Sequence, residues 1–491
     1  MRTFDYFVNN CFVAPLSGEY IESENPANAE VWAQVPNCGN DDVNRAVEAA
    51  KAAFYEGQWG QMMPAQRGRI LRRMGDLISR HADRLGSIET KDNGKLPGNI
   101  TPSLRPGAWQ VDSFHYYAGM CDKFEGRLLP TEVPDMHNYL KWEPFGVCAL
   151  ILPWNSPLGT LIWKLTPCLA AGNTVVLKPS EQSSCSTLEL MDVLLEADLP
   201  PGVLNVVTGY GPQTAGTLIS HPDVRMVSFT GGTDGGRAVA RLAAEQVKPV
   251  VMELGGKSPQ IVLPDADLKL AANGICAGIF PAGGQSCISG SRILVHESVT
   301  EEITRKLVEI VSRANVGDPL DPNTQIGPMA NKTHYERVLN LIAQAEASGH
   351  HLLVDGRNAC REKGYYIGPT IFANVPNDSD LAQTEIFGPV VSIQSWSNEP
   401  DVIRIANDTA YGLAAGIWSQ DATRAMRIAD QIEAGTVYIN NYFNAATQSP
   451  VGGHKQSGYG RENGWEGMRC FMQTKSVWLS TNPSQPDPFA R

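Results

Sequence analysis

The feature that most constrains the fold is a series of short, continuously apolar segments that alternate with helical stretches in the middle of the chain. The strand-like segments are residues 147–153, 173–178, 204–208 and 226–230, with a helical stretch over 187–197. Continuously apolar strands separated by helices are typical of a parallel sheet that helices cover on both faces. We therefore predict a doubly wound α/β domain, which binds ligands at the carboxyl ends of its strands.

A second series of alternating segments follows. Its strand-like segments are residues 249–254, 258–262, 293–295, 416–419 and 435–439, and its helical segments are 268–277, 300–313, 400–407 and 421–432. Because one hydrophobic core stops growing at roughly 250–300 residues, a chain of 491 residues has room for this second α/β domain. Upstream, residues 41–90 predict helices. Asp41 and Asp42 stand at the start of the first, and a second helical pattern covers 67–90.

Composition argues against several classes of function. The net charge of −12 disfavours nucleic acids and anionic membranes as partners, because both bind to basic patches. The 10 cysteines contain no C-x-x-C pair, so we expect no metal site. The N-terminus lacks a basic stretch followed by an apolar run, and the apolar runs are too short to span a bilayer. We expect a cytoplasmic protein with reduced thiols.

One cysteine stands among small residues. Cys287 lies in the segment 280–292, after Gly283 and Gly284 and before Gly290. A structural cysteine prefers apolar neighbours, whereas a nucleophilic cysteine needs backbone that a substrate can approach closely. The segment fits a nucleophile, although most buried cysteines are inert.

Two further segments follow the ends of predicted strands, where ligands bind in this fold. Asn155 follows the first strand and either caps a helix or donates its amide N–H to an oxyanion. Lys178 and Glu181 follow the second strand and form either a surface ion pair or a grip on a nucleotide ribose. A carboxylate at this place repels a 2′-phosphate, so it favours NAD over NADP.

Glycines and a carboxylate mark the next two strand ends. Residues 229–236 place glycines between a strand and a helix, where they either bind a pyrophosphate through backbone N–H groups or form a simple turn. Residues 256–258 read Gly-Lys-Ser, but the earlier glycine of a P-loop is Val251 in this chain. Glu253 is then either a general base with a raised pKa or a partner for the lysine.

Together these segments resemble the NAD(P)-dependent aldehyde dehydrogenase superfamily, and the resemblance covers essentially the whole chain. It begins at residues 25–27 and ends near 474–477, with further matches at 385–389, 407–413 and 452–458. Many ordered motifs make the resemblance specific. It implies an α/β fold with a Rossmann-like cofactor domain, a second α/β catalytic domain and a small β-flap for oligomerisation.

The resemblance also implies a reaction, the NAD-dependent oxidation of an aldehyde to a carboxylic acid. The cysteine that matches Cys287 attacks the aldehyde to form a thiohemiacetal, which passes a hydride to the nicotinamide and becomes a thioester. The carboxylate that matches Glu253 activates the water that hydrolyses this thioester. The amide that matches Asn155 forms the oxyanion hole together with the N–H of the cysteine.

The same resemblance assigns the cofactor contacts, for NAD rather than NADP. Lys178 and Glu181 hold the adenosine ribose, and residues 229–232 meet the pyrophosphate. Trp154 lines the cleft, while Glu385 lies on the nicotinamide side. The full set of implied cofactor-binding residues is Ile151, Trp154, Lys178, Ser180, Glu181, Gly211, Phe229, Gly231, Gly232, Gly235, Leu254, Gly255, Glu385 and Phe387.

The resemblance further implies three structural regions. They are an NAD-binding domain (1–123 and 144–254), a catalytic domain (255–469) and an oligomerisation segment (124–143 and 470–491). The last region would assemble the chain into a homodimer or homotetramer.

The chain departs from the family pattern at several positions. Gly232 replaces a common serine, and Pro281 and Ala282 replace an aromatic residue and an asparagine. Small or polar residues replace aromatic ones along the substrate tunnel at Ser156, Ala445 and Val451. Such walls favour a bulky, hydroxylated or semialdehyde substrate.

Two alternative functions stay open. An acylating aldehyde dehydrogenase passes the thioester to coenzyme A and usually lacks the base, so Glu253 argues against it. A thiol esterase would use Cys287 without a cofactor. Arg105 and Arg461 are unassigned candidates for binding a substrate carboxylate.

Overall fold

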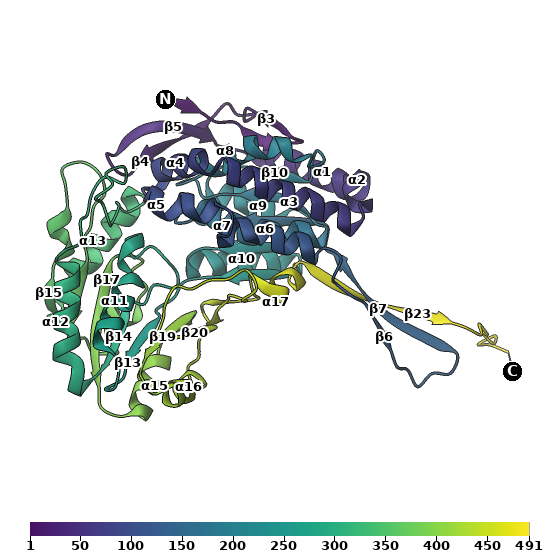
Figure 1. The fold of residues 1–491 in the computed structure, drawn as a ribbon. Helices are drawn as coiled ribbons and strands as arrows, with labels where there is room; N and C mark the ends of the chain where they lie inside the picture. The colour runs from purple at the N-terminus through teal and green to yellow at the C-terminus, as the bar shows by residue number, and fades with distance from the viewer. Residues whose placement is uncertain (491) are drawn as a thin grey trace.

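A computed structural model describes residues 1–490, and it contains two large sheets and a small sheet that projects from the body (Figure 1). The first sheet has eight strands in the order β22-β12-β11-β8-β9-β10-β2-β3. Its parallel strands are β8 (Val147–Ile151), β9 (Thr174–Lys178), β10 (Leu204–Val206), β11 (Val224–Thr230) and β12 (Val250–Glu253). Its antiparallel strands are β2 (Tyr6–Val8), β3 (Cys11–Val13) and β22 (Gly458–Tyr459).

The chain builds this sheet outward from β8 in both directions. β9 and β10 follow on one side, and the chain then returns to place β11 and β12 on the other side. The strand order therefore reverses between β8 and β11. Ligands of open α/β sheets bind at the carboxyl ends of the strands beside such a reversal.

Helices cover both faces of the first sheet, which confirms the predicted fold class. One face carries α3 (Pro64–Arg80), α6 (Trp109–Met120), α7 (Pro157–Ala171) and α8 (Cys185–Leu194). The other face carries α1 (Asn40–Tyr55), α9 (Gly216–Ser220) and α10 (Thr233–Glu245). Because successive side chains of a strand point to opposite faces, Leu150 of β8 joins the first core and Ala149 and Ile151 join the second.

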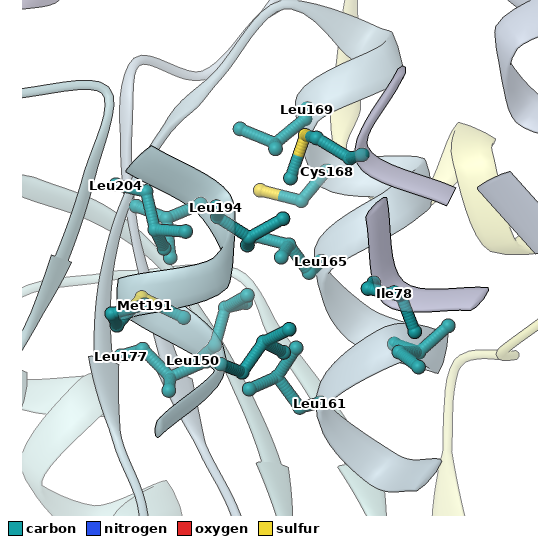
Figure 2. Close-up of a cluster of buried hydrophobic side chains, with 14 of the residues drawn as sticks. Ile78, Leu150, Leu161, Leu165, Cys168, Leu169, Leu177, Met191, Leu194 and Leu204 are labelled. Carbon is teal, nitrogen blue, oxygen red and sulfur yellow. The ribbon is translucent and has the colours of Figure 1, made fainter. Parts of the chain in front are cut away.

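Figure 2 shows the core between α7, α8 and the sheet. Its labelled residues are Ile78, Leu150, Leu161, Leu165, Cys168, Leu169, Leu177, Met191, Leu194 and Leu204. Leu165 is fully buried there, so shortening it to alanine would cost about 2–5 kcal/mol of stability. This packing fixes the start of α7, and with it the loop that holds Asn155.

The second sheet has seven strands in the order β15-β16-β17-β14-β13-β19-β20, and β15 alone runs antiparallel to its neighbour. The strands are β13 (Pro259–Val262), β14 (Arg292–His296), β15 (His351–Val354), β16 (Thr370–Ala373), β17 (Val390–Trp396), β19 (Ala414–Trp418) and β20 (Thr436–Ile439). The helices of this region are α11 (Leu268–Ala277), α12 (Thr300–Val311), α13 (Lys332–Ala347), α15 (Glu399–Asn407) and α16 (Ala422–Ala429). The second alternating pattern thus forms a second α/β unit.

Three smaller sheets complete the fold, and one of them pairs β18 (Tyr411–Gly412) with β21 (His454–Lys455). β1 (Arg2–Thr3), β4 (Tyr20–Asn25) and β5 (Glu30–Pro36) form a sheet that the sequence analysis did not predict. The projecting sheet consists of β6 (Arg127–Leu129), β7 (Met136–Pro144) and β23 (Met472–Ser480). β7 and β23 pair along their whole length, from Pro144 opposite Met472 to Met136 opposite Ser480. This sheet has the expected shape of the flap (Figure 1).

Two local expectations were wrong. The helical pattern of 67–90 is two helices, α3 and α4 (Ala82–Asn93), which meet at His81 without a glycine or proline to mark the break. Residues 249–254 form β12 of the first sheet and not a strand of the second. The expected helix start is confirmed, because Asp41 and Asp42 lie in the first turn of α1 and Asp42 accepts a hydrogen bond from the Gly39 N–H at 3.0 Å.

Candidate active site

The segments that carry Glu253 and Cys287 come from different sheets. Glu253 ends β12, the last parallel strand of the first sheet, and the chain then enters β13 of the second. Cys287 lies in the loop before β14 of the second sheet. The two loops touch, since a methyl group on Gly256 would lie 2.4 Å from the carbonyl oxygen of Cys287.

The loop before Cys287 has a backbone that requires glycine. Gly283 and Gly284 have φ values of 61° and 69°, in the left-handed region that favours glycine. A methyl group on Gly284 would lie 2.0 Å from the carbonyl oxygen of Gly388. Gln285, which follows Gly284, is held by its own side chain, because its Oε1 accepts a hydrogen bond from the Ala330 N–H at 2.9 Å. The glycines thus permit close packing against a neighbouring loop.

The surroundings of the Cys287 thiol favour its protonated form. Its residue is half-buried. Burial, together with the charges of nearby carboxyl groups such as Glu253 and Glu385, raises the pKa of the Cys287 thiol to about 12, while the Ile288 N–H opposes the shift. A thiolate is the reactive form, so this thiol must lose its proton as it reacts.

Glu253 is a buried carboxyl group with one unpaired oxygen. Its residue is 5% exposed, and its Oε1 has no hydrogen-bond partner among residues 1–490. Burial raises the pKa of Glu253 well above its usual value, Glu462 raises it further, and Lys164 and Arg461 oppose the shift. A carboxyl group with a raised pKa can take up a proton near neutral pH, which suits a general base.

Sequence reasoning missed the buried ion pair beside Glu253. Lys164 of α7 donates to Glu462 and, at 2.8 Å, to the hydroxyl of Ser228. The Lys164 side chain is fully buried and that of Glu462 is 4% exposed. Because removing one partner of a buried pair leaves an uncompensated charge, each holds the other in place.

Asn155 faces the cysteine loop. Its Nδ2 donates to the carbonyl oxygen of Gln285 at 2.8 Å. Helix α7 begins after Ser156 and has no side-chain cap, so the capping role is wrong. An amide nitrogen carries two N–H groups, and Gln285 occupies one of them.

Lys178 and Glu181 form an ion pair with each other. Lys178 ends β9, and its Nζ donates to Oε2 of Glu181 at 3.0 Å. The lysine side chain is 3% exposed and the glutamate 24%, so the ammonium group is buried and the carboxylate is partly exposed. Burial lowers the pKa of Lys178, and Glu181 opposes the shift. Ser180 lies in the turn between them.

The glycine turn after β11 leaves a helix end without a side-chain cap. Helix α10 starts after Gly232, whose backbone is extended. Glycine has no side chain that could cap the first N–H groups of the helix. A methyl group added at Gly232 would have no atom within 4 Å. A methyl group added at Gly231 would lie 2.5 Å from the Phe229 ring, and one added at Gly235 would lie 3.2 Å from it. The free N–H groups of a helix N-terminus suit a phosphate. The hydroxyl of Thr230 is also buried and unpaired within the described chain.

The remaining predicted cofactor residues border the same strand ends. Ile151 ends β8, Gly211 begins the turn after β10, and Leu254 and Gly255 follow β12. The Leu254 N–H donates to the carbonyl of Ser457 at 2.9 Å. The Ser457 hydroxyl in turn donates to the carbonyl of Gly255 at 2.7 Å. The end of β12 is therefore held on both sides.

The segment 385–387 is fixed by side chains that sequence reasoning did not identify. Arg337 of α13 donates to the carbonyl oxygens of Ile386 at 2.7 Å and Glu385 at 2.8 Å. His334 of the same helix donates from Nε2 to the carbonyl of Phe387 at 2.7 Å. Burial lowers the pKa of His334 to about 4, so this ring is neutral at physiological pH.

Glu385 and Phe387 contact two neighbouring segments of the site. Oε1 of Glu385 accepts the Gly256 N–H at 2.8 Å. The centroid of the Phe387 ring lies 5.3 Å from that of the Trp154 ring, edge to face. The backbone of Phe387 has a φ of 60°. Glu385, Phe387 and Trp154 therefore belong to one wall, next to the loop of Cys287.

A cavity of about 200 Å³ opens beside the cysteine loop. Its walls are Asn93, Gly94, Lys95, Leu96, Asn155, Ser156, Pro281, Ala282, Gly283, Gln285, Ser286, Gly327, Pro328, Ala330 and Phe443. Neither unassigned arginine lines it: Arg105 pairs with Asp83, and Arg461 donates to the carbonyls of Gly453 and Gly460.

Residues 1–490 contain no group of His, Cys, Asp and Glu side chains placed to hold a metal ion. No helix in this part of the chain has the length and apolar content that crossing a bilayer requires.

Comparison with known proteins identifies the family. The model of the aldehyde dehydrogenase family matches residues 12–477. The chain is 41% identical to human aldehyde dehydrogenase 1A1, over 96% of this chain and 94% of that protein. It is 40% identical to the (Z)-2-((N-methylformamido)methylene)-5-hydroxybutyrolactone dehydrogenase of Acinetobacter baylyi, over 100% of this chain and 99% of that protein.

Solved structures agree with this result. The NAD+ complex of an aldehyde dehydrogenase from Bacillus cereus superposes with a TM-score of 0.95 at 39% identity, covering 98% of this chain and 97% of that one. A point mutant of betaine aldehyde dehydrogenase from Staphylococcus aureus, in complex with NAD+ and with a BME-modified cysteine, gives a TM-score of 0.97 at 33% identity over the full length of both chains. The chain therefore belongs to the aldehyde dehydrogenase family and is an oxidoreductase that acts on aldehydes.

Proposed function

We propose that the enzyme oxidises an aldehyde to a free carboxylic acid, with Cys287 as the nucleophile and NAD as the cofactor. The observation that carries the proposal is the convergence of three groups on one loop. Asn155 donates to the residue two positions before Cys287, Glu253 lies close enough to raise the pKa of the thiol, and the adjoining loop touches the Cys287 carbonyl.

The first step joins Sγ of Cys287 to the aldehyde carbon while the thiol gives up its proton to solvent. The carbonyl oxygen gains negative charge as this bond forms. The second N–H of the Asn155 amide stabilises that charge, since a fixed donor in a partly desolvated site favours the tetrahedral state. Gln285 keeps the amide in position through its carbonyl.

The residues of the first sheet suit a dinucleotide. Glu181 is placed to accept from ribose hydroxyls, and a carboxylate there disfavours a 2′-phosphate. The uncapped N-terminus of α10 and the open side of Gly232 suit the pyrophosphate. NAD, when bound, supplies the hydride acceptor. We assign cofactor binding to 1–123 and 144–254 and catalysis to 255–469, although β22 adds residues of the second region to the first sheet.

Glu253 completes the reaction by taking a proton from water as that water attacks the thioester. Its buried, unpaired Oε1 is the acceptor that such a base needs. The Lys164–Glu462 pair keeps the charge around this carboxyl balanced. The Cys287–acyl bond then breaks, and the free acid leaves.

The walls of the cavity favour an oxygenated substrate over a plain alkyl aldehyde. Ser156, Asn155 and Ser286 present polar groups, whereas Pro281 and Ala282 add little bulk. The relative from A. baylyi is named for a hydroxylated lactone, which agrees in character with such walls. We propose a hydroxylated compound or a semialdehyde.

Assembly and location follow from the same reasoning. The flap exposes apolar side chains, among them Leu128 at 69% and Trp478 at 56%, which favours burial against a second copy in a homodimer or homotetramer. The reaction needs Cys287 as a free thiol. Because the cytoplasm keeps thiols reduced, we propose a cytoplasmic location.

The test measures NADH formation from a panel of aldehydes by wild type and Cys287→Ala, with and without coenzyme A. We expect wild type to form NADH and free acid, NADP to be used less well than NAD, and Cys287→Ala to be inactive. Acyl-CoA as the product, or ester cleavage without any NAD dependence, would instead support one of the two alternative functions. Cys360→Ala is the matched control, because Cys360 is exposed and is not among the residues that line the cavity.

A further inference from the structure

The cavity beside Cys287 contains one side chain that is charged. Lys95 follows Gly94, which ends α4 with a φ of 76°. The turn directs the lysine to Ser156, whose hydroxyl accepts a hydrogen bond from Lys95 Nζ at 3.0 Å. The other residues that line the cavity are neutral: asparagine, glutamine, serine, glycine, proline, alanine, leucine and phenylalanine.

Lys95 retains hydrogen-bonding capacity toward the cavity. An ammonium group has three N–H donors, and Ser156 is its one acceptor within hydrogen-bonding distance among residues 1–490. The nearest carboxylate oxygen, Oε1 of Glu89, is 3.8 Å away. The other oxygen of Glu89 already accepts the Leu158 N–H at 3.1 Å. Glu89 therefore balances the charge of Lys95 without occupying its remaining donors.

The position of Lys95 relates it to the reacting carbon. Ser156, which holds its ammonium group, directly follows Asn155, the proposed oxyanion donor. Asn155, Ser156 and Lys95 line the same cavity, so one molecule bound there can contact both the ammonium group and the Asn155 amide. Ala282 and Gly283 of the cysteine loop line this cavity too, and their side chains add little bulk.

We propose that Lys95 binds a carboxylate at the far end of the aldehyde, so that the enzyme selects short semialdehydes. The inference rests on the proposed function and adds the chemical class of its substrate. An ammonium group pairs with a carboxylate through a charge-assisted hydrogen bond, which is stronger than a bond to a neutral oxygen. The carboxylate would use the N–H donors that Ser156 leaves free.

The test compares succinic semialdehyde with its methyl ester and with pentanal, using the complete enzyme and NAD. Lys95→Met removes the charge and keeps the length of the side chain. We expect it to lower kcat/KM for succinic semialdehyde by about tenfold to a hundredfold, mainly through KM. The kcat/KM values for the ester and for pentanal should change less than about threefold, because neither substrate has a carboxylate to pair with the Lys95 ammonium group.

Two further variants separate binding from structure. Lys95→Arg keeps the positive charge, so it should restore most of the preference for the semialdehyde. Lys91→Met is the matched control, because Lys91 lies on the exposed side of α4, over the Trp32 ring at 5.2 Å, and it should alter none of the three substrates.

Each contrary result is distinct. An equal loss for all three substrates would show a structural role, and an equal loss for the ester and the acid would show that the charge is not recognised; either overturns the inference. Turnover of pentanal with no effect of Lys95→Met on the semialdehyde overturns it as well, and leaves the proposed function standing. Absence of NADH from all aldehydes overturns both.

Discussion

The two sides of the Cys287 loop are built differently. On the side of segment 385–387, the backbone is tied to α13 by Arg337 and His334, and Gly284 packs against Gly388 with no room for a methyl group. On the side of Ser156, the loop borders a cavity with small walls and a lysine that has donors to spare. The tight side suits steps that every substrate shares, and the open side suits selection among substrates.

The largest effect should come from Glu253, whose loop is tied to the tight side by the hydrogen bond from the Gly256 N–H to Glu385. Glu253→Gln keeps the shape of the side chain but removes the base. We expect the steady-state rate to fall by about 10²–10⁴-fold, for the semialdehyde and for an alkyl aldehyde alike. Stopped-flow absorbance would show NADH released in a single burst.

Asp122→Asn is a control for the loss of a carboxylate, because Asp122 is exposed and pairs only with its neighbour Lys123. Its rate should match that of wild type. A loss in Glu253→Gln that depends strongly on the aldehyde would place Glu253 on the selective side and break the comparison.

The next effect tests the packing of the tight side directly. Gly284→Ala forces a methyl group toward the Gly388 carbonyl at a positive φ. We expect a loss of about 2–4 kcal/mol in the free energy of unfolding, measured by urea denaturation, together with a lower kcat. The neighbouring Ala282→Ser change, on the cavity wall, should alter KM and leave stability within about 0.5 kcal/mol. Equal stability of the two variants would contradict the difference between the sides.

The pH dependence of activity follows from the two raised pKa values. Burial keeps protons on the Cys287 thiol and on Glu253, and both groups must lose them to act. We expect kcat/KM to rise with pH from neutral into the alkaline range, by up to about tenfold for each pH unit. An acid optimum would contradict the protonated state of this site.

Stability should change with pH in the opposite direction. The pKa of Glu253 is raised in the folded protein, so its contribution is complete below the ordinary glutamate pKa and is lost as pH rises through the raised value. Glu253→Gln does not titrate. We therefore expect the difference in Tm between the variant and wild type to grow in favour of the variant as pH rises, as measured by calorimetry.

The smallest effect concerns the cofactor turn. Gly232 has open space where a methyl group would stand, so Gly232→Ser should fold normally and change the KM for NAD by no more than about threefold. Gly231→Ser is the matched contrast, because its side chain would meet the Phe229 ring at 2.5 Å. It should raise the KM for NAD more than Gly232→Ser does. The reverse order would show that the turn is not held by the Phe229 ring.

The fold could be predicted where the signal was local. Helix α11 has the expected bounds, Leu268–Ala277, because its apolar residues recur with a helical period. The break at His81 carries no glycine or proline, so no local signal marked it. β1, β4 and β5 each contain exposed residues. Because their apolar residues form only a weak pattern, the sequence did not predict these strands.

The site could be predicted where short motifs carry it. Cys287, Glu253 and Asn155 all lie at strand ends or in the glycine-rich loop. Lys164 and Glu462 were missed because they are 298 residues apart and each looks like an ordinary surface charge in the sequence. Lys95 was missed for the same reason, since only the fold brings it to Ser156.

The central claim is that Cys287 carries the acyl group that Glu253 releases. Glu253→Gln should be mixed with NAD and pentanal, quenched in acid, digested and analysed by mass spectrometry. We predict that the peptide containing Cys287 gains the mass of one pentanoyl group and that wild type shows far less of this adduct. An unmodified Cys287 peptide after a full burst of NADH, or an acyl group on another cysteine, would contradict the account.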